Sequence, residues 1–121
     1  KLTGNAIRVP TPNVSLAVMS LTVDKNDLSK DGVNEFLRKT AFNSKYREIV
    51  GFVNSTEIVS SDFYSSPFAS VIDSQATIVS DNKITLYCWY DNEYGYSVQV
   101  VNLVKNIAGI NLIRLPVKVW Y

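Results

Sequence analysis

The chain has 121 residues, of which 46% are hydrophobic, 19% charged and 12% aromatic, a composition typical of one folded domain rather than a disordered segment. A fold of this size buries about two thirds of the surface that its unfolded chain exposes, so neither a metal nor a disulfide is needed to stabilise it. Twelve Lys and Arg against eleven Asp and Glu leave a net charge of +1, which excludes a broad electrostatic field for nucleic acid or an anionic membrane. Any anion site must therefore be local.

The residue types that are missing limit the chemistry further. The chain has no histidine, which excludes Ser-His-Asp and Cys-His pairs, a histidine general base and a histidine-bearing zinc site, and we expect no metal site. Cys88 is the only cysteine, so no disulfide can form within the chain and a reducing compartment is expected. The chain starts at Lys1 without a signal-peptide pattern, and it has no apolar run long enough for a membrane helix. We expect a piece of a longer soluble protein.

The first elements are a strand and a helix. The alternating sequence NVSLAVMSLTV predicts a largely buried strand over residues 13–23, and Pro10 and Pro12 keep the chain before it extended. Ser29 is a suitable N-cap, and apolar residues at helical spacing then predict a helix over residues 30–42.

The rest of the chain reads as extended segments followed by a helix. The extended segments are predicted over residues 49–54, 57–63, 70–79 and 84–90. Asp81 and Asn82 tolerate the positive φ of a tight hairpin between the last two strands. A final helix is predicted over residues 94–108, with an apolar face and Gly109 as its stop.

This order of elements predicts an α+β fold. The economical arrangement is a mostly antiparallel sheet with two helices packed on one face, because each helix must bury one apolar side. No Gly-x-Gly-x-x-Gly joins a strand to a helix, so a complete dinucleotide-binding domain is absent from the chain. The apolar tail over residues 112–121 is expected to be packed or to face a partner.

Two stretches carry candidate chemistry. Arg8 lies beside two prolines and either forms a surface salt bridge or presents its guanidinium as a fixed fork to a phosphate or carboxylate. The stretch CWYDNEYGYS (residues 88–97) joins a strand to the last helix. Asp91 or Asn92 can be the helix N-cap there, and the Asn92 amide can alternatively bind a ligand's carboxamide.

Together, RVPTPNVS (residues 8–15) and WYDNEYGYS (residues 89–97) resemble two specific signatures of the glyceraldehyde-3-phosphate dehydrogenases, in that family's order and with SSDF between them. The resemblance runs from Lys1 to about Gly109. It implies that residues 1–121 form one unit, the C-terminal part of the catalytic domain, without a nucleotide-binding domain. It also implies a parent enzyme of glycolysis that is NAD-dependent, phosphorylating, cytoplasmic and homotetrameric.

The resemblance also implies residue roles. In that family a cysteine attacks the aldehyde, hydride passes to the nicotinamide, and inorganic phosphate cleaves the resulting thioester. Arg8 matches the arginine that binds the phosphates of the sugar-phosphate aldehyde and of the attacking phosphate. Asn92 matches the asparagine that holds the nicotinamide carboxamide, and Tyr96 the aromatic residue beside the nicotinamide. Glu93 matches an acidic residue with a supporting role.

The departures from the family pattern concern the reaction itself. The family's Ser-Cys-Thr-Thr-Asn segment and its histidine base do not occur here, and Cys88 is expected to pack in the core instead. Phe68 stands where the family commonly has a histidine. We therefore expect the 121-residue chain alone to be inactive and not to bind NAD tightly.

Two alternatives remain open. One is an erythrose-4-phosphate dehydrogenase, which shares the family's motifs. The other is a non-catalytic binding or assembly fragment that self-associates through exposed apolar surface, including Phe63, Tyr64, Phe68 and the tail.

Overall fold

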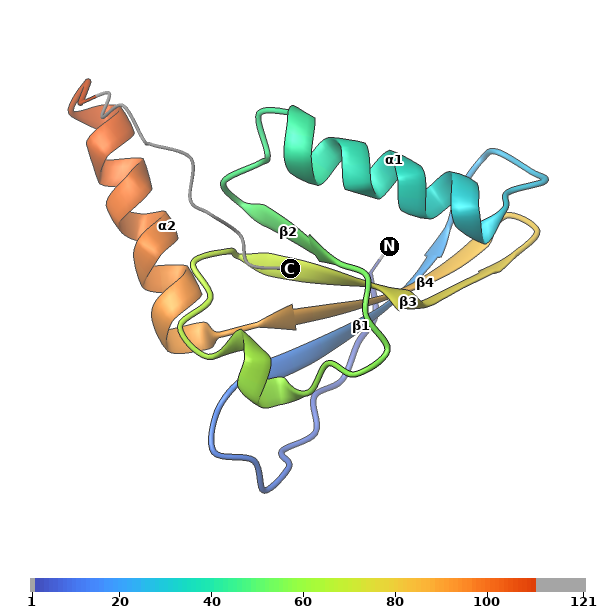
Figure 1. Ribbon diagram of the computed structural model, residues 1–121, viewed down its shortest axis with the longest axis horizontal. Coiled ribbons are helices and arrows are strands. Elements are labelled where there is room, and N and C mark those ends of the chain that lie inside the picture. The colour runs from blue at the N-terminus through green and yellow to red at the C-terminus, as the bar shows by residue number, and fades with distance from the viewer. Residues whose placement is uncertain (1, 111–121) are drawn as a thin grey trace.

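A computed structural model describes residues 2–110 and has an α+β fold built on one four-stranded sheet (Figure 1). Its elements in chain order are β1 (Ser15–Thr22), α1 (Lys30–Asn43), β2 (Val50–Val53), the 3₁₀ turn η1 (Ser60–Phe63), β3 (Ser70–Ser80), β4 (Lys83–Tyr90) and α2 (Asn92–Ile107). The strand order is β1-β4-β3-β2. Strands β1, β4 and β3 pair antiparallel, whereas β2 runs parallel to β3. The predicted α+β class is confirmed, with a sheet that is mixed.

The hydrophobic core lies between α1 and one face of the sheet (Figure 1). The helix begins where predicted, because the Ser29 hydroxyl accepts a hydrogen bond from the Gly32 amide at 3.1 Å. Val33 and Ala41 are the buried residues of its inner side. The core cluster joins Val33 to residues of β3 and β4, namely Ile72, Ile84, Leu86 and Cys88.

The predicted hairpin between β3 and β4 is also confirmed. Asp81 takes a φ of 55° in the two-residue turn, and the Ser80–Lys83 pair closes the ladder. The register shifts between Asp73 and Ile78, which marks a bulge in β3. Beyond this bulge the ladder continues to Val71, which pairs with Trp89.

The prediction that the first strand is largely buried is wrong. β1 lies at the edge of the sheet, and Leu16 and Val18 are 40% and 55% exposed. The apolar alternation correctly indicated a strand, but burial depends on what covers it. Helix α1 contacts β2 and β3 on the core face of the sheet. Leu16 and Val18 pair with Trp89 and Tyr87, so they point to the opposite face, which α1 does not cover.

The segment 57–63, predicted as extended, contains the 3₁₀ turn η1 instead. The turn forms because the Asp62 carboxylate accepts a hydrogen bond from the Val59 amide at 2.8 Å. Phe63 follows and stacks on Trp89, with ring centroids 5.3 Å apart. Trp89 neighbours the core residue Cys88 along β4, so this stack lies on the sheet face opposite α1.

Helix α2 does not pack on the sheet face beside α1, contrary to the sequence prediction. It continues beyond the end of β4 and projects away from the sheet (Figure 1). Its apolar residues are accordingly exposed, by 40% at Val100, 49% at Val101, 59% at Val104 and 79% at Ile107. No helix within residues 2–110 has the length and apolar character required to cross a membrane.

The direction of α2 is set by contacts of its first turns with the loop after η1. Gly95 is buried against this loop, and a Cβ added there would lie 2.6 Å from the Phe68 carbonyl oxygen. One turn later, the Gln99 amide donates a hydrogen bond to the Pro67 carbonyl at 2.9 Å. The first half of α2 is therefore held, while the apolar side chains of its second half are exposed.

Substituting Gly95→Ala tests this close approach. Alanine would stabilise a free helix, but here its methyl group meets backbone, so we expect the free energy of unfolding to fall by about 1–3 kcal/mol. Urea unfolding followed by circular dichroism measures the change. Gly4→Ala is the matched control, because a Cβ at Gly4 would have no atom within 4 Å apart from those of Gly4 and its two chain neighbours. A Gly95→Ala protein as stable as the parent would contradict the contact.

Candidate functional site

Asp91 lies between β4 and α2 and is only 3% exposed. One carboxylate oxygen accepts hydrogen bonds from the Glu93 and Tyr94 amides, at 3.1 and 3.0 Å. The other accepts from the Ser65 amide at 2.9 Å and from the Asn13 side-chain amide at 3.3 Å. A single side chain thus joins the start of α2, the loop after η1 and the segment before β1.

The same contacts fix the charge of Asp91. Hydrogen bonds from the backbone, that of Tyr94 above all, hold the pKa of the Asp91 carboxyl below its usual value, although its burial acts in the opposite direction. Asp91 is therefore ionised at neutral pH and is the N-cap of α2. Of the two caps that the sequence allowed, Asn92 is not used, and its side-chain amide remains available to a ligand.

The candidate residues of α2 lie together in its first turns. Asn92, Glu93 and Tyr96 are all exposed, Tyr96 by 71%. Residues four positions apart share one side of a helix, so the Asn92 amide and the Tyr96 ring are presented side by side. Because Gly95 and the Asp91 cap hold these turns, the two groups stand on a rigid element.

Arg8 lies on the N-terminal segment (residues 2–14), which has neither helix nor strand and leaves Arg8 exposed. This segment enters β1 at Ser15, whose partner across the ladder is Tyr90, at the end of β4. Both motifs consequently meet at one end of the sheet, where α2 starts (Figure 1). Within residues 2–110, no hydrogen bond or ion pair joins Arg8 to the candidate residues of α2.

Cys88 is close to these residues in the sequence, but it is buried whereas they are exposed. It is 3% exposed and belongs to the core, as predicted. Burial raises the pKa of its thiol, and the nearby Asp73 carboxylate acts in the same direction. A thiol that resists ionisation is a poor nucleophile, so Cys88 has no part in the candidate site.

One residue of the apolar surface predicted for an assembly fragment is not exposed. Phe63 is buried in its stack with Trp89, whereas Tyr64 is 43% exposed. Phe68 is half-buried, with its ring over Gly51. The tail lies outside the described residues.

Sequence reasoning missed Asn13 and Ser65. Asn13 is only the first residue of the predicted strand, and its bond to Asp91 spans 78 positions. Ser65 has a φ of 58°, an unusual conformation for serine that directs its amide towards Asp91. Only the run of small polar residues around Ser65 hinted at a functional loop.

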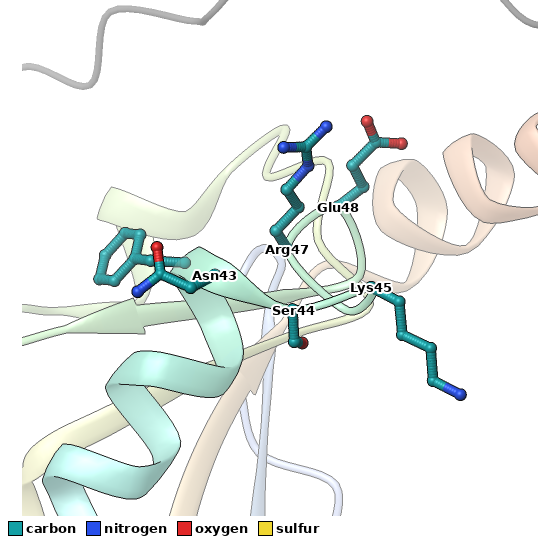
Figure 2. A pocket seen from close by; sticks show the side chains of 6 residues that line it. Asn43, Ser44, Lys45, Arg47 and Glu48 are labelled. Atoms are coloured by element: carbon teal, nitrogen blue, oxygen red, sulfur yellow. The ribbon is translucent and has the colours of Figure 1, made fainter.

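A hollow of about 520 Å³ lies elsewhere, in the loop that follows α1. Figure 2 shows that Arg47 and Glu48 extend side by side to the top of the view, whereas Lys45 extends away from them to the lower right. These side chains do not converge on a ligand, and none of the candidate residues lines the hollow. Within residues 2–110, no three His, Cys, Asp or Glu side chains are grouped to hold a metal ion.

Substituting Asp91→Asn should weaken the fold at neutral pH. The amide oxygen can still cap α2, but the NH₂ group would face the two donors Ser65 and Asn13, so we expect a loss of about 1–3 kcal/mol in the free energy of unfolding. Because the folded-state pKa of Asp91 is lowered, its ionic contribution is complete above the unfolded pKa, about 4, and is lost as the pH falls through the folded value.

Urea unfolding between pH 7 and pH 2.5 checks this expectation. The hydrogen bond from Arg38 lowers the pKa of Glu35 to about 2, so the parent has a second acid-sensitive carboxyl. The difference between parent and Asp91→Asn isolates Asp91, and it should shrink as the solution is acidified. A difference that is the same at every pH would contradict the assignment.

Comparison with known proteins matches most of the chain to one family. The family model described as the C-terminal domain of glyceraldehyde 3-phosphate dehydrogenase matches residues 1–92, which include β1–β4 and both ends of the Asn13–Asp91 hydrogen bond.

Three relatives extend the match over most of the chain. A glyceraldehyde-3-phosphate dehydrogenase-like protein of Pseudomonas aeruginosa (strain UCBPP-PA14) is 51% identical over 116 residues, 96% of this chain and 25% of that protein. Glyceraldehyde-3-phosphate dehydrogenase 2 of Bacillus subtilis (strain 168) is 42% identical over 112 residues, 89% of this chain and 31% of that protein. The chloroplastic glyceraldehyde-3-phosphate dehydrogenase GAPB of Arabidopsis thaliana is 43% identical over 109 residues, 89% of this chain and 24% of that protein.

The chain thus spans about a quarter to a third of the length of these relatives. The family model alone covers more than half of the 121 residues. The chain belongs to the glyceraldehyde-3-phosphate dehydrogenase family and corresponds to part of its C-terminal domain.

Proposed function

We propose that the chain supplies the phosphate-binding and nicotinamide-orienting part of an NAD-dependent, phosphorylating glyceraldehyde-3-phosphate dehydrogenase of glycolysis. The observation that carries this proposal is the meeting of two distant motifs at one end of the sheet, where Asn13 bonds to Asp91. Arg8 belongs to one motif and Asn92 to the other. A sugar-phosphate aldehyde and inorganic phosphate would be the substrates, and the parent would be a cytoplasmic homotetramer.

The α2 residues fit a nicotinamide. An exposed side-chain amide and an exposed aromatic ring on one side of a helix match a carboxamide joined to a flat ring. Asn92 would exchange two hydrogen bonds with the carboxamide, Tyr96 would pack beside the ring, and Glu93 would have a supporting role. When bound, NAD supplies the acceptor for the hydride.

Arg8 suits a phosphate. Its planar guanidinium can give two parallel hydrogen bonds to phosphate oxygens. Arg8 has no ion-pair partner among residues 2–110, so an anion would not have to displace a carboxylate. The nucleophile and the base must come from outside these 121 residues, since Cys88 is buried and histidine is absent.

The two alternatives use different features. An erythrose-4-phosphate dehydrogenase would use Arg8 and Asn92 in the same way, and turnover of the two aldehydes by the intact parent separates these substrates. An assembly fragment would instead use the exposed apolar residues of α2 and β1, such as Ile107 and Val18. Such a fragment would not need Arg8.

A chimera tests the proposal. Residues 1–109 replace the matching segment of the Bacillus subtilis relative, and NADH formation is followed with glyceraldehyde 3-phosphate and phosphate. We expect an active enzyme in which Arg8→Ala lowers kcat/KM for the aldehyde by about tenfold to a hundredfold, the loss typical of a charge-assisted hydrogen bond. Asn92→Ala should mainly raise the KM for NAD.

The matched control is Arg47→Ala, which removes the same charge from the hollow after α1. It should leave both kinetic constants unchanged. If Arg8→Ala behaves like Arg47→Ala in an active chimera, Arg8 does not bind the substrate phosphate and the proposal fails. A chimera that folds but is inactive would favour the assembly alternative.

A further inference from the structure

Within residues 2–110, the N-terminal segment is joined to the rest of the fold by a hydrogen bond at one point. Among these described residues, the one hydrogen bond between residues 2–14 and the residues that follow them runs from the Asn13 side-chain amide to Asp91, at 3.3 Å. The segment forms no pair with a strand, and its residues before Asn13 are exposed. Its placement therefore depends on Asn13.

Asn13 also holds an unusual backbone turn. Val14 has a φ of 71°, a conformation that β-branched residues rarely adopt because of steric strain. The Asn13 side-chain oxygen accepts a hydrogen bond from the Val14 amide at 2.7 Å, while its NH₂ group donates to Asp91. One side chain thus stabilises the turn and fixes its position against α2. Without it, Val14 is free to relax to an extended conformation and redirect the segment.

The stretch between this turn and Arg8 is stiff. Pro10 and Pro12 have restricted φ angles, and the Thr11 amide donates to the Val9 carbonyl at 2.9 Å. A change of direction at Val14 would accordingly move Arg8 rather than be absorbed in between.

We propose that Asn13 is a positioning residue for Arg8, an inference that rests on the function proposed above. The two carboxylate oxygens of Asp91 have different partners. One caps the helix that carries Asn92, and the other accepts a hydrogen bond from the Asn13 side chain. The carboxylate thereby sets where the phosphate-binding cation lies relative to the nicotinamide-binding amide. Loss of the Asn13 side chain releases Arg8 and leaves the cap of α2 in place.

Asn13→Ala in the chimera tests the kinetic side of this role. We expect the KM for inorganic phosphate and for the aldehyde to rise about tenfold, while the KM for NAD stays within about twofold, because the Asp91 cap remains. The matched control is Asn26→Ala, an exposed asparagine before α1. It should change none of these constants. An equal rise in the KM for NAD, or no rise for phosphate, would overturn the proposal.

A second measurement does not depend on activity. In the 121-residue chain, the ¹⁵N heteronuclear Overhauser effects of residues 5–9 and of Thr11 should fall in Asn13→Ala and stay at the parent's values in Asn26→Ala. Unchanged values in Asn13→Ala would overturn the positioning role even if the chimera is active. If the unsubstituted chimera is inactive, the proposed function fails, and this comparison still decides whether Asn13 holds the segment.

Discussion

The ionised carboxylate of Asp91, almost completely removed from solvent, is the constraint on which the rest of the site depends. A buried charge is tolerated only when hydrogen-bond donors surround it, and here four donors come from three separate stretches of chain. The start of α2, the loop after η1 and the N-terminal segment cannot move apart without leaving that charge unpaired. Their arrangement is a consequence of satisfying one side chain.

This constraint explains why the first turns of α2 are held in place whereas the apolar residues of its later turns are exposed. Its first turns are capped by Asp91 and packed through Gly95 against the loop, so Asn92 and Tyr96 stand on a fixed support. Its later turns expose valine, leucine and isoleucine. A binding site benefits from the fixed first turns, because an orienting amide is effective only when it is held in place. Arg8 differs from these residues, since it lies on an irregular segment that, within residues 2–110, is joined to the rest of the fold by the Asn13–Asp91 hydrogen bond.

The sequence predicted local structure well and long-range structure poorly. Helix α1 and the β3–β4 hairpin follow from the Ser29 cap and the Asp81 turn, which act within a few residues. The exposure of β1 and the direction of α2 depend on which neighbour covers them, and no local pattern contains that information. In the site, the family's motifs identified Arg8 and Asn92 as candidates. They did not identify Asn13 or Ser65, whose bonds to Asp91 connect residues 78 and 26 positions apart.

Hydrogen exchange at the Ser65 amide tests the central role of Asp91 most directly. Ser65 is exposed and lies outside every helix and strand, so its amide would exchange at nearly the rate of an unfolded chain without the bond to Asp91. The arrangement described above predicts slow exchange at neutral pH, comparable with that of the Tyr94 amide, and rapid exchange at Ser65 in Asp91→Asn. Rapid exchange at Ser65 in the parent chain would contradict it.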